Sequence, residues 1–299
     1  MKCPVCLEKT EWTEGAEFAG VASHMLANAK QADGEHAMWL KRYAGHKEIT
    51  ETDLEALLSK LYETDGNLKR WIVNRLIERI YTSPPHPFIQ RLQHPDRKTI
   101  YGYVMEHHHF LVQWVRCCSS IISRTDLEDV QLYEIDNIVS EFRGNPPEQQ
   151  SHHELLLRMG ESIGVDRTTV YATRPLPATA NCLAWWNRIA NECSWIETMA
   201  AMHTLELTAN PEIKKLGSDM TYFDPAILED REYPDAVKSF LYEGYKADAG
   251  HSMEALDLIV KYCSTTELQH DIQSVVFKTV KLLDDYLMAR LERGEMLAD

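Results

Sequence analysis

The chain has 299 residues, which is enough for one large helical domain or two ordinary ones. Its 46 acidic residues outnumber its 31 lysines and arginines, so the formal net charge is −15. Because so acidic a surface repels phosphate backbones and anionic lipid headgroups, we expect no nucleic-acid partner and no membrane partner. Apolar residues make up 44% of the chain, and glycine and proline are few, which is typical of a globular, mostly helical protein.

The N-terminal sequence, MKCPVCLEKTEW, lacks the basic region and the apolar core of a secretory signal. The longest apolar stretches of the chain break within about ten residues, whereas a membrane span needs roughly twenty. Seven cysteines at irregular spacing do not form the pattern of a secreted disulfide framework. We therefore expect a cytoplasmic protein, in which a Cys-x-x-Cys pair holds a metal or does redox chemistry.

Two cysteines near the N-terminus have the spacing of half a zinc site. Cys3 and Cys6 can present two thiolates from one tight turn, and a tetrahedral ion needs two further ligands. His24 and His36 are the nearest candidates, each in a separate predicted helix. We predict a structural zinc site formed by these four residues in a module spanning residues 1–45. The alternatives are a frayed N-terminus with two incidental cysteines and a redox pair, although no βαβ context surrounds the motif.

The rest of the chain reads as helices. The most apolar segment, residues 101–122, is expected at the centre of a bundle, and the helical pattern over 256–291 is expected to break near 264–266. No segment reads as a strand, so we predict an all-α fold. The predicted regions are the zinc-binding module at 1–45, a helical connector at 46–98 and a helical domain at 99–299.

Spacing alone also indicates a helix after residue 128. The apolar residues there recur at steps of three and four. They are Leu132, Ile135, Val139 and Phe142. Further along, the segment that begins at Ser151 has a hydroxyl followed three residues later by Glu154, which is the capping box that starts a helix.

A carboxylate continues an apolar stripe in the segment 193–209. Trp195, Met199, Met202 and Glu206 follow one another at steps of four, three and four, which places them on one helical face. A lone carboxylate on a buried face must pair, protonate or bind a cation, because an unpaired buried charge costs several kcal/mol. Glu206 is therefore a candidate metal ligand.

Other titratable residues lie on helical faces that we expect to be buried. Glu141 lies near the end of one predicted helix, and His152 begins the next one in line with leucines. Asp248 and His251 share a face further along the chain. With Glu206 they supply three carboxylates and two imidazoles from four helices, which are the ligand types that iron or manganese takes in bundle cores.

Two Glu-x-x-His pairs offer a different metal site. Glu106/His109 and Glu267/His270 have the spacing that ferritin-like di-iron proteins use. A chain this rich in Glu and His contains such a pair by chance on the order of once, and the second pair lies in a polar stretch typical of a solvated face. We therefore favour the first set of ligands.

The segment HHELLLRMGESIGV, which begins at His152, resembles a known family. It is similar to the His-Pro-Glu-Leu helix, ending in a small-residue turn, of the heme-oxygenase-like superfamily. That superfamily includes thiaminase II, the pyrroloquinoline-quinone synthase type and the heme-oxygenase-like non-heme diiron oxidases. The resemblance covers roughly residues 99–290 and implies a heme-oxygenase-like helical bundle preceded by the Cys/His module.

The resemblance also implies iron ligands, because the diiron oxidases carry theirs at matching positions. The matching residues of this chain are Glu141, His152, Glu206, Asp248 and His251. The last ligand helix of these oxidases has the pattern His-x3-Asp-x2-His, and Gly244 replaces the first histidine, so one iron would lack a ligand. The number of iron ions is therefore left open. Glu243 or a tyrosine could replace the missing ligand, the site could hold a single ion, or the centre could be metal-free.

Taken with the resemblance, these residues predict an iron-dependent oxidase or oxygenase that uses dioxygen. Its substrate would be a small organic molecule of the amino acid, amine or fatty acid class. The alternatives are a thiaminase-like hydrolase with a nucleophilic cysteine, a metal-free oxidase of the same fold, and a non-catalytic zinc-containing interaction protein. A homodimer is a further expectation.

Overall fold

The protein is helical throughout in this computed structural model, which describes residues 1–45, 48–82, 84–144 and 150–297. Within 246–251 the helical backbone is described but the side chains are not. No β-strand occurs over these ranges, only an isolated bridge between Lys2 and Lys9, so the all-α prediction is confirmed. None of the helices in the described ranges has both the length and the hydropathy of a bilayer-spanning segment.

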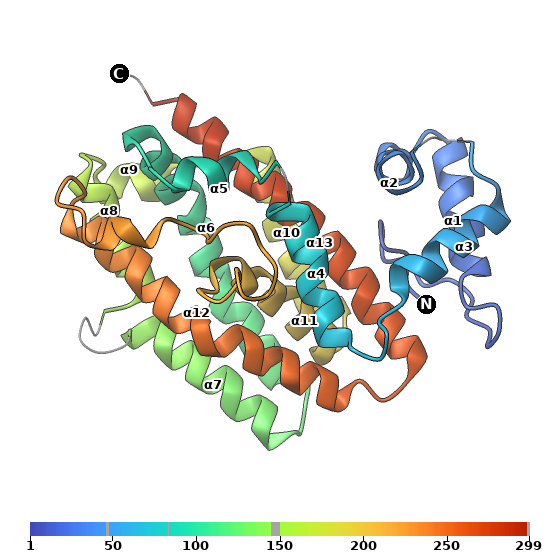
Figure 1. The fold of residues 1–299 in the computed structure, drawn as a ribbon. Helices are drawn as coiled ribbons and strands as arrows, with labels where there is room; N and C mark the ends of the chain where they lie inside the picture. The colour runs from blue at the N-terminus through green and yellow to red at the C-terminus, as the bar shows by residue number, and fades with distance from the viewer. Residues whose placement is uncertain (46–47, 83, 145–149, 298–299) are drawn as a thin grey trace.

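The helices form one large bundle with a smaller helical group at one end (Figure 1). In chain order they are α1 (Ala19–Lys30), α2 (Gly34–Ala44), α3 (Glu51–Tyr62), α4 (Leu68–Ile80), α5 (Pro87–Leu92), α6 (Arg97–Ile122), α7 (Glu128–Arg143), α8 (His152–Ser162), α9 (Arg167–Ala172), α10 (Pro177–Glu192), α11 (Trp195–Glu206), the 3-10 turns η1 (Leu207–Ala209) and η2 (Pro225–Leu228), α12 (Asp235–Tyr262) and α13 (Thr266–Glu295).

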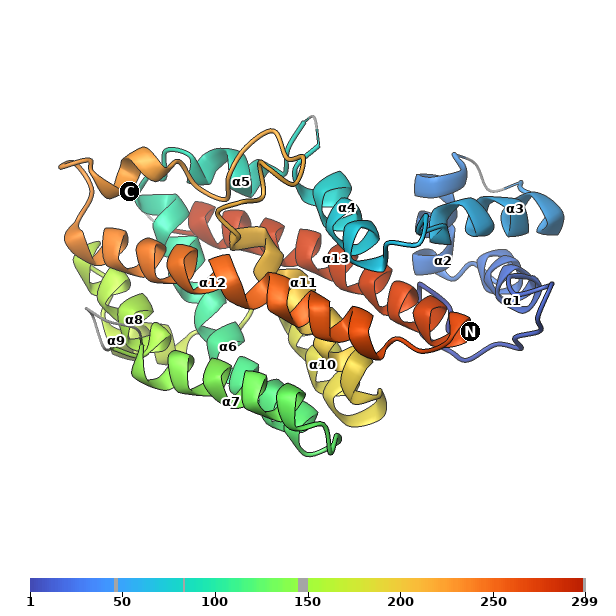
Figure 2. The same cartoon turned by 60° about the horizontal axis from the view of Figure 1, so that its bottom comes forward.

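Helix α6 lies at the centre of the bundle, as its apolar sequence predicts. It packs against α7, α8, α10, α11 and α13, and these helices surround it in two views (Figures 1 and 2). Asp96 begins α6 by accepting a hydrogen bond of 2.7 Å from the Thr99 N–H. Ser151 begins α8 in the same way, as predicted, with the Glu154 N–H donating at 3.1 Å. The predicted break between the last two helices is also confirmed, because Thr265 caps α13.

Helices α6 and α13 touch backbone to backbone. A Cβ atom at Gly102 would lie 1.9 Å from the carbonyl oxygen of Arg290, and one at Gly294 would lie 2.6 Å from that of Lys98. Only glycine fits at either position without moving a helix axis. This close approach determines how far the side chain of Arg290 reaches into the interior of the bundle.

Replacing Gly102 by alanine is expected to lower the free energy of unfolding by about 1–3 kcal/mol, because the added methyl group forces α6 and α13 apart. Urea denaturation measures this difference. Gly34→Ala in α2 is the matched control, since a Cβ there meets nothing within 4 Å. An equal loss of stability in both variants would contradict the packing argument.

Helix α7 turns its apolar stripe away from the core. The residues of the stripe are exposed by 42–64%: Leu132, Ile135, Val139 and Phe142. The opposite face is buried and carries two polar residues, Glu134 and Asn137. The apolar spacing therefore predicted the helix correctly. The face that α7 buries, however, is the opposite one, which supplies polar groups to the interior. An exposed apolar stripe is the kind of surface that oligomers bury, and the homodimer stays a prediction.

The N-terminal residues are fixed to the bundle through Lys2. Its N–H donates to Oδ1 of Asp271 at 2.6 Å, and its carbonyl accepts from the Ser274 hydroxyl at 2.6 Å. Its ammonium group pairs with Glu197 of α11. These contacts place the Cys-x-x-Cys turn against the start of α13 (Figure 2). The region boundaries predicted near residues 45 and 98 stay predictions.

Candidate functional site

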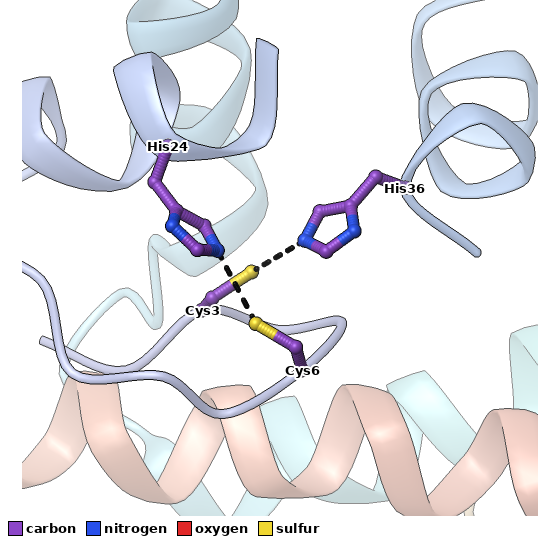
Figure 3. Close-up of side chains that lie close together, drawn as sticks. All are labelled: Cys3, Cys6, His24 and His36. Carbon is purple, nitrogen blue, oxygen red and sulfur yellow. Dashed lines mark hydrogen bonds between the residues drawn. The ribbon is translucent and has the colours of Figure 1, made fainter. Parts of the chain in front are cut away.

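The N-terminal module brings its four predicted zinc ligands together. Cys3 and Cys6 lie on one turn, which is closed by a 2.9 Å hydrogen bond from the Leu7 N–H to the Cys3 carbonyl. His24 projects from α1 and His36 from α2 toward the two sulfur atoms (Figure 3). Nε2 of His24 is 3.2 Å from Sγ of Cys6, and Nε2 of His36 is 3.5 Å from Sγ of Cys3. One ligand atom from each residue lies within 4.8 Å of the others, so the group can hold a metal ion.

A carboxylate orients one of these imidazoles. Asp33 caps α2 by accepting a hydrogen bond of 3.0 Å from the His36 N–H, and the same Oδ1 lies 2.7 Å from Nδ1 of the His36 ring. When Nδ1 donates to this carboxylate, Nε2 keeps its lone pair toward the sulfur atoms. Such a carboxylate–histidine pair is the usual support of a metal-binding imidazole.

The two thiols differ in acidity because they share a hydrogen bond. Accepting it from Cys3 lowers the pKa of Cys6 to about 3, although burial opposes this shift. The same hydrogen bond, together with burial, raises the pKa of Cys3. Cys6 is therefore the more acidic of the two thiols, and a metal bound by both sulfur atoms would displace their protons.

A second candidate site is a cavity of about 80 Å³ inside the bundle, enclosed by α6, α7, α8, α11, α12 and α13. A water molecule needs about 10–15 Å³, so the cavity holds several waters or a small organic group. Most of its wall is apolar, including Phe110, Leu111, Trp114, Leu205, Phe223 and Phe240. Three of the predicted iron ligands also line it: Glu141, His152 and Glu206.

Glu141 of α7 and His152 of α8 face each other at the cavity. Oε1 of Glu141 is 3.4 Å from Nδ1 of His152. Burial lowers the pKa of His152, but the charge of Glu141, its hydrogen bond to the ring, and the charges of Glu243 and Glu206 together outweigh burial, so the net shift of the pKa is upward. His152 therefore lies in a field of negative charge that favours a cation.

Glu206 ends α11 and belongs to a buried hydrogen-bond network. Its Oε2 hydrogen-bonds Nδ1 of His203, whose Nε2 lies 3.0 Å from Oε1 of Glu134. Burial lowers the pKa of His203, but the two carboxylates raise it to about 10, so both ring nitrogens carry protons. The Asn137 amide donates to the other oxygen of Glu206 at 3.2 Å, and Trp114 donates to the Asn137 carbonyl oxygen at 3.0 Å.

Three members of this network were not among the predicted site residues. They are Glu134, Asn137 and His203. A signal for the first two was present, because Glu134, Asn137 and Glu141 follow at steps of three and four along the face of α7 opposite the apolar stripe. The signal for His203 is its place in the last turn of α11, three residues before Glu206, in a helix whose residues 196–204 are all buried.

Asp248 and His251 lie outside the side chains that the structure describes, so their predicted role as ligands is not placed. Gly244, one turn before Asp248 in α12, does line the cavity. A Cβ atom at Gly244 would lie 3.7 Å from Nε2 of His152. Position 244 therefore faces His152.

The bundle site is less compact than the N-terminal one. Among the described side chains, only the Cys/His cluster gathers three or more ligand atoms within 4.8 Å. Glu141, His152 and Glu206 share a cavity wall, but an ion bound by all three would have to draw their donor atoms closer together.

The two Glu-x-x-His pairs do not line the cavity. Glu106 is fully buried and accepts a hydrogen bond of 2.6 Å from Nε of Arg293, which is a structural ion pair. The expectation of a solvated face is wrong for His270, which is buried with its ring centroid 5.0 Å from that of Phe18. A polar stretch does not exclude burial where a helix docks against the N-terminal module, and Asp271 next to His270 is buried as well.

None of the described cavity-lining residues is a cysteine. Cys117, Cys118 and Cys182 are buried elsewhere in the bundle. Burial raises the pKa of Cys117 to about 11 and that of Cys182 to about 12, so both are thiols at neutral pH. The described cavity wall therefore contains no thiolate nucleophile.

Comparison with solved structures shows the same fold in several proteins. The chain is similar to a domain of unknown function with a heme oxygenase-like fold from Shewanella denitrificans OS217, with a TM-score of 0.55 and 18% identity over 83% of this chain and 95% of that chain. A TenA homolog from Pseudomonas syringae pv. tomato str. DC3000 has a TM-score of 0.56 and 18% identity, covering 80% and 92%. A TenA family transcription regulator from Silicibacter sp. TM1040 has a TM-score of 0.55 and 16% identity, covering 78% and 99%. The predicted heme-oxygenase-like bundle is confirmed.

The sequence matches a family model but no curated protein. The model is that of the TENA/THI-4/PQQC family, and it matches residues 71–293. That range contains every residue that lines the cavity and leaves out the Cys/His cluster. The chain belongs to the TENA/THI-4/PQQC family.

Proposed function

We propose that this protein is an iron-dependent oxidase or oxygenase that uses dioxygen on a small organic substrate bound in the bundle cavity. The observation that carries the proposal is the negative charge buried there. Within the described part of the chain, the only ion-pair partners of Glu141 and Glu206 are imidazoles, not lysines or arginines. Glu134 and Glu206 share the single positive charge of His203, so the carboxylates outnumber the imidazole that pairs with them. Such an excess of buried negative charge favours a bound cation.

The residues present fit iron by their chemistry. Glu141, His152 and Glu206 would hold the ion, joined by Asp248 and His251, the further ligands that the family resemblance implies. Carboxylates with imidazoles are the donors of non-heme Fe(II) sites that keep open positions. When bound, the ion supplies the one-electron chemistry with dioxygen that no amino acid side chain provides.

The chain's own groups prepare this site. Doubly protonated His203 donates to one oxygen of Glu206, and Asn137 donates to the other, so the orientation of that carboxylate is fixed. The Phe240 ring covers His152 at a centroid distance of 4.9 Å, which keeps bulk water away from the imidazole. These contacts leave a polar patch in an otherwise apolar cavity, where a small substrate is oriented by shape.

We also propose that the N-terminal cluster holds zinc as a structural ion. Tetrahedral Zn–S bonds of about 2.3 Å and Zn–N bonds of about 2.0 Å place sulfur and nitrogen about 3.5 Å apart. The two sulfur–nitrogen distances here are 3.2 and 3.5 Å. With four protein ligands no position is left for a substrate, which is typical of structural sites.

Two unpaired cysteines held this way fit a reducing compartment, so we place the protein in the cytoplasm.

A thiaminase-like hydrolase of the same fold is less well supported. It needs a nucleophilic cysteine at the cavity, and none of the described lining residues supplies one. A non-catalytic zinc-containing interaction protein would leave the buried carboxylates of the cavity without a role.

Loading the metal-free protein with Fe(II) under argon and then admitting air tests the proposed function. We expect iron that survives desalting, and dioxygen consumption that requires this iron. His152→Ala and His251→Ala should lose both. Absence of iron uptake in the unmodified protein, or uptake unchanged in both variants, would overturn the proposal.

Replacing Gly244 by histidine is expected to raise the iron content from about one to about two ions per chain, because it restores the ligand that a two-ion site requires. The nearest atom to a Cβ at this position is Nε2 of His152, at an ordinary van der Waals distance of 3.7 Å, so a side chain can be added. Elemental analysis after reconstitution measures the ratio. Gly244→Ala adds the Cβ without a ligand, and equal iron contents in the two variants would contradict the prediction.

A further inference from the structure

Arg290 is a buried cation in the wall of the same cavity. It projects from α13 and is 2% exposed. Its guanidinium carbon lies 4.1 Å from the ring centroid of Tyr103 and 4.5 Å from that of Tyr286. The aromatic rings and the close backbone packing of Gly102 hold it in place.

The hydrogen-bond partners of Arg290 are all neutral. Its N–H groups donate to the Tyr222 hydroxyl at 2.6 Å, to the Tyr286 hydroxyl at 2.9 Å and to Nδ1 of His107 at 3.0 Å. Burial and the charge of Arg290 lower the pKa of His107 far below its usual value, so this imidazole is neutral. A guanidinium has five N–H groups, and Nε of Arg290 has no partner among the described residues.

No carboxylate of the described chain forms an ion pair with Arg290. The contrast is Arg293, one turn later in α13, which pairs with Glu106 at 2.6 Å. The fold therefore supplies a counter-charge to one arginine of this helix and leaves the other without one. Arginine cannot neutralise itself by losing its proton at any ordinary pH, and an unpaired buried charge is strongly destabilising.

We infer that Arg290 binds a carboxylate group of the substrate, with Tyr222 beside it, and so restricts the cavity to carboxylic acids. The inference rests on the proposed function in taking this cavity as the substrate site. His107 lies between Arg290 and His152. Its Nδ1 is 3.0 Å from Arg290, and its ring centroid is 6.4 Å from that of His152. A carboxylate on Arg290 directs the rest of the molecule along His107 toward His152, where the reaction would take place.

Binding of hexanoate and hexanamide to the metal-free, full-length protein tests this inference, because the two probes differ in charge but hardly in size. Calorimetry in EDTA at pH 7 should show that hexanoate binds at least tenfold more tightly, as a charged hydrogen-bonded pair in a buried site implies. In Arg290→Gln this preference should disappear, with hexanoate losing at least tenfold more affinity than hexanamide. Lys281→Gln, which removes a cation of α13 that does not line the cavity, should keep the full preference.

The outcomes separate this inference from the proposed function. Equal affinities for the two probes in the unmodified protein, or a preference that survives in Arg290→Gln, would overturn it even if iron is taken up normally. A carboxylate preference without iron uptake would support it and overturn only the iron proposal. If Arg290→Gln does not fold, as judged by circular dichroism, Arg290→Lys decides: a preference reduced at least threefold supports the inference, and an unchanged one overturns it.

Discussion

Replacing Glu206 by alanine is expected to abolish iron retention and to lower dioxygen consumption at least 100-fold, since loss of a supporting residue alone costs 10–100-fold. Glu206 is held on both carboxylate oxygens, by His203 on one and Asn137 on the other. Removing it takes away a negative charge that faces the cavity. Iron content after desalting and the rate of dioxygen uptake measure the two effects.

Two further variants show whether the loss is specific to the metal site. Glu206→Gln keeps the shape and one acceptor oxygen but removes the charge, so iron affinity should still fall. Glu197→Ala is the matched control, because Glu197 is also buried in α11 but pairs with Lys2 outside the cavity. It should lower stability and leave iron retention intact. Loss of iron in Glu197→Ala as well would show that disruption of α11, not the ligand, is responsible.

The fold was largely predictable because helical periodicity and helix ends are local properties of the sequence. The apolar segment at residues 101–122 became the central helix, and Thr265 at the predicted break caps α13. The same periodicity does not say which way a helix faces. The stripe from Leu132 to Phe142 was read correctly as helical, but the bundle buries Glu134 and Asn137 instead.

The inner network was only partly predictable, for the same physical reason. Periodicity assigns apolar faces to the core, and a buried network of acids, amides and imidazoles reverses that rule wherever its members satisfy one another. Glu206 was found because it interrupts a stripe of Trp and Met residues. His203, a partner of Glu206, lies three residues earlier on the same helix. Asn137 and Glu134, which hydrogen-bond Glu206 and His203 respectively, come from α7, 69 positions away in the sequence, so their contact depends on tertiary packing.

The N-terminal cluster shows how much of a metal site a short motif predicts. Cys3-x-x-Cys6 fixes two donors through the geometry of one turn, and the nearest imidazoles completed the set that the structure brings together. The motif alone does not predict how α1 and α2 are arranged so that His24 and His36 reach the same point. It also does not predict that Asp33 orients the His36 ring.

Replacing Cys6 by serine is expected to remove the zinc ion and to unfold the N-terminal module, because structural zinc contributes on the order of 10–16 kcal/mol to the folding of small zinc-dependent units at pH 7. Without the ion, α1 and α2 lose the point at which they meet. Elemental analysis should show the loss of zinc, and amides of residues 1–45 should exchange with solvent much faster. Cys263→Ser, at a half-buried cysteine outside the cluster, should change neither.

The same variant also tests whether the two candidate metal sites are independent. The module is attached to α13 through Lys2, and α13 carries cavity residues such as Tyr286, so part of the destabilisation should reach the bundle as a lower melting temperature. Iron uptake, which depends on α7, α8, α11 and α12, should persist in Cys6→Ser, while Glu206→Ala should keep its zinc. Loss of both metals in either variant would contradict this separation and would mean that the module and the cavity fold as one unit.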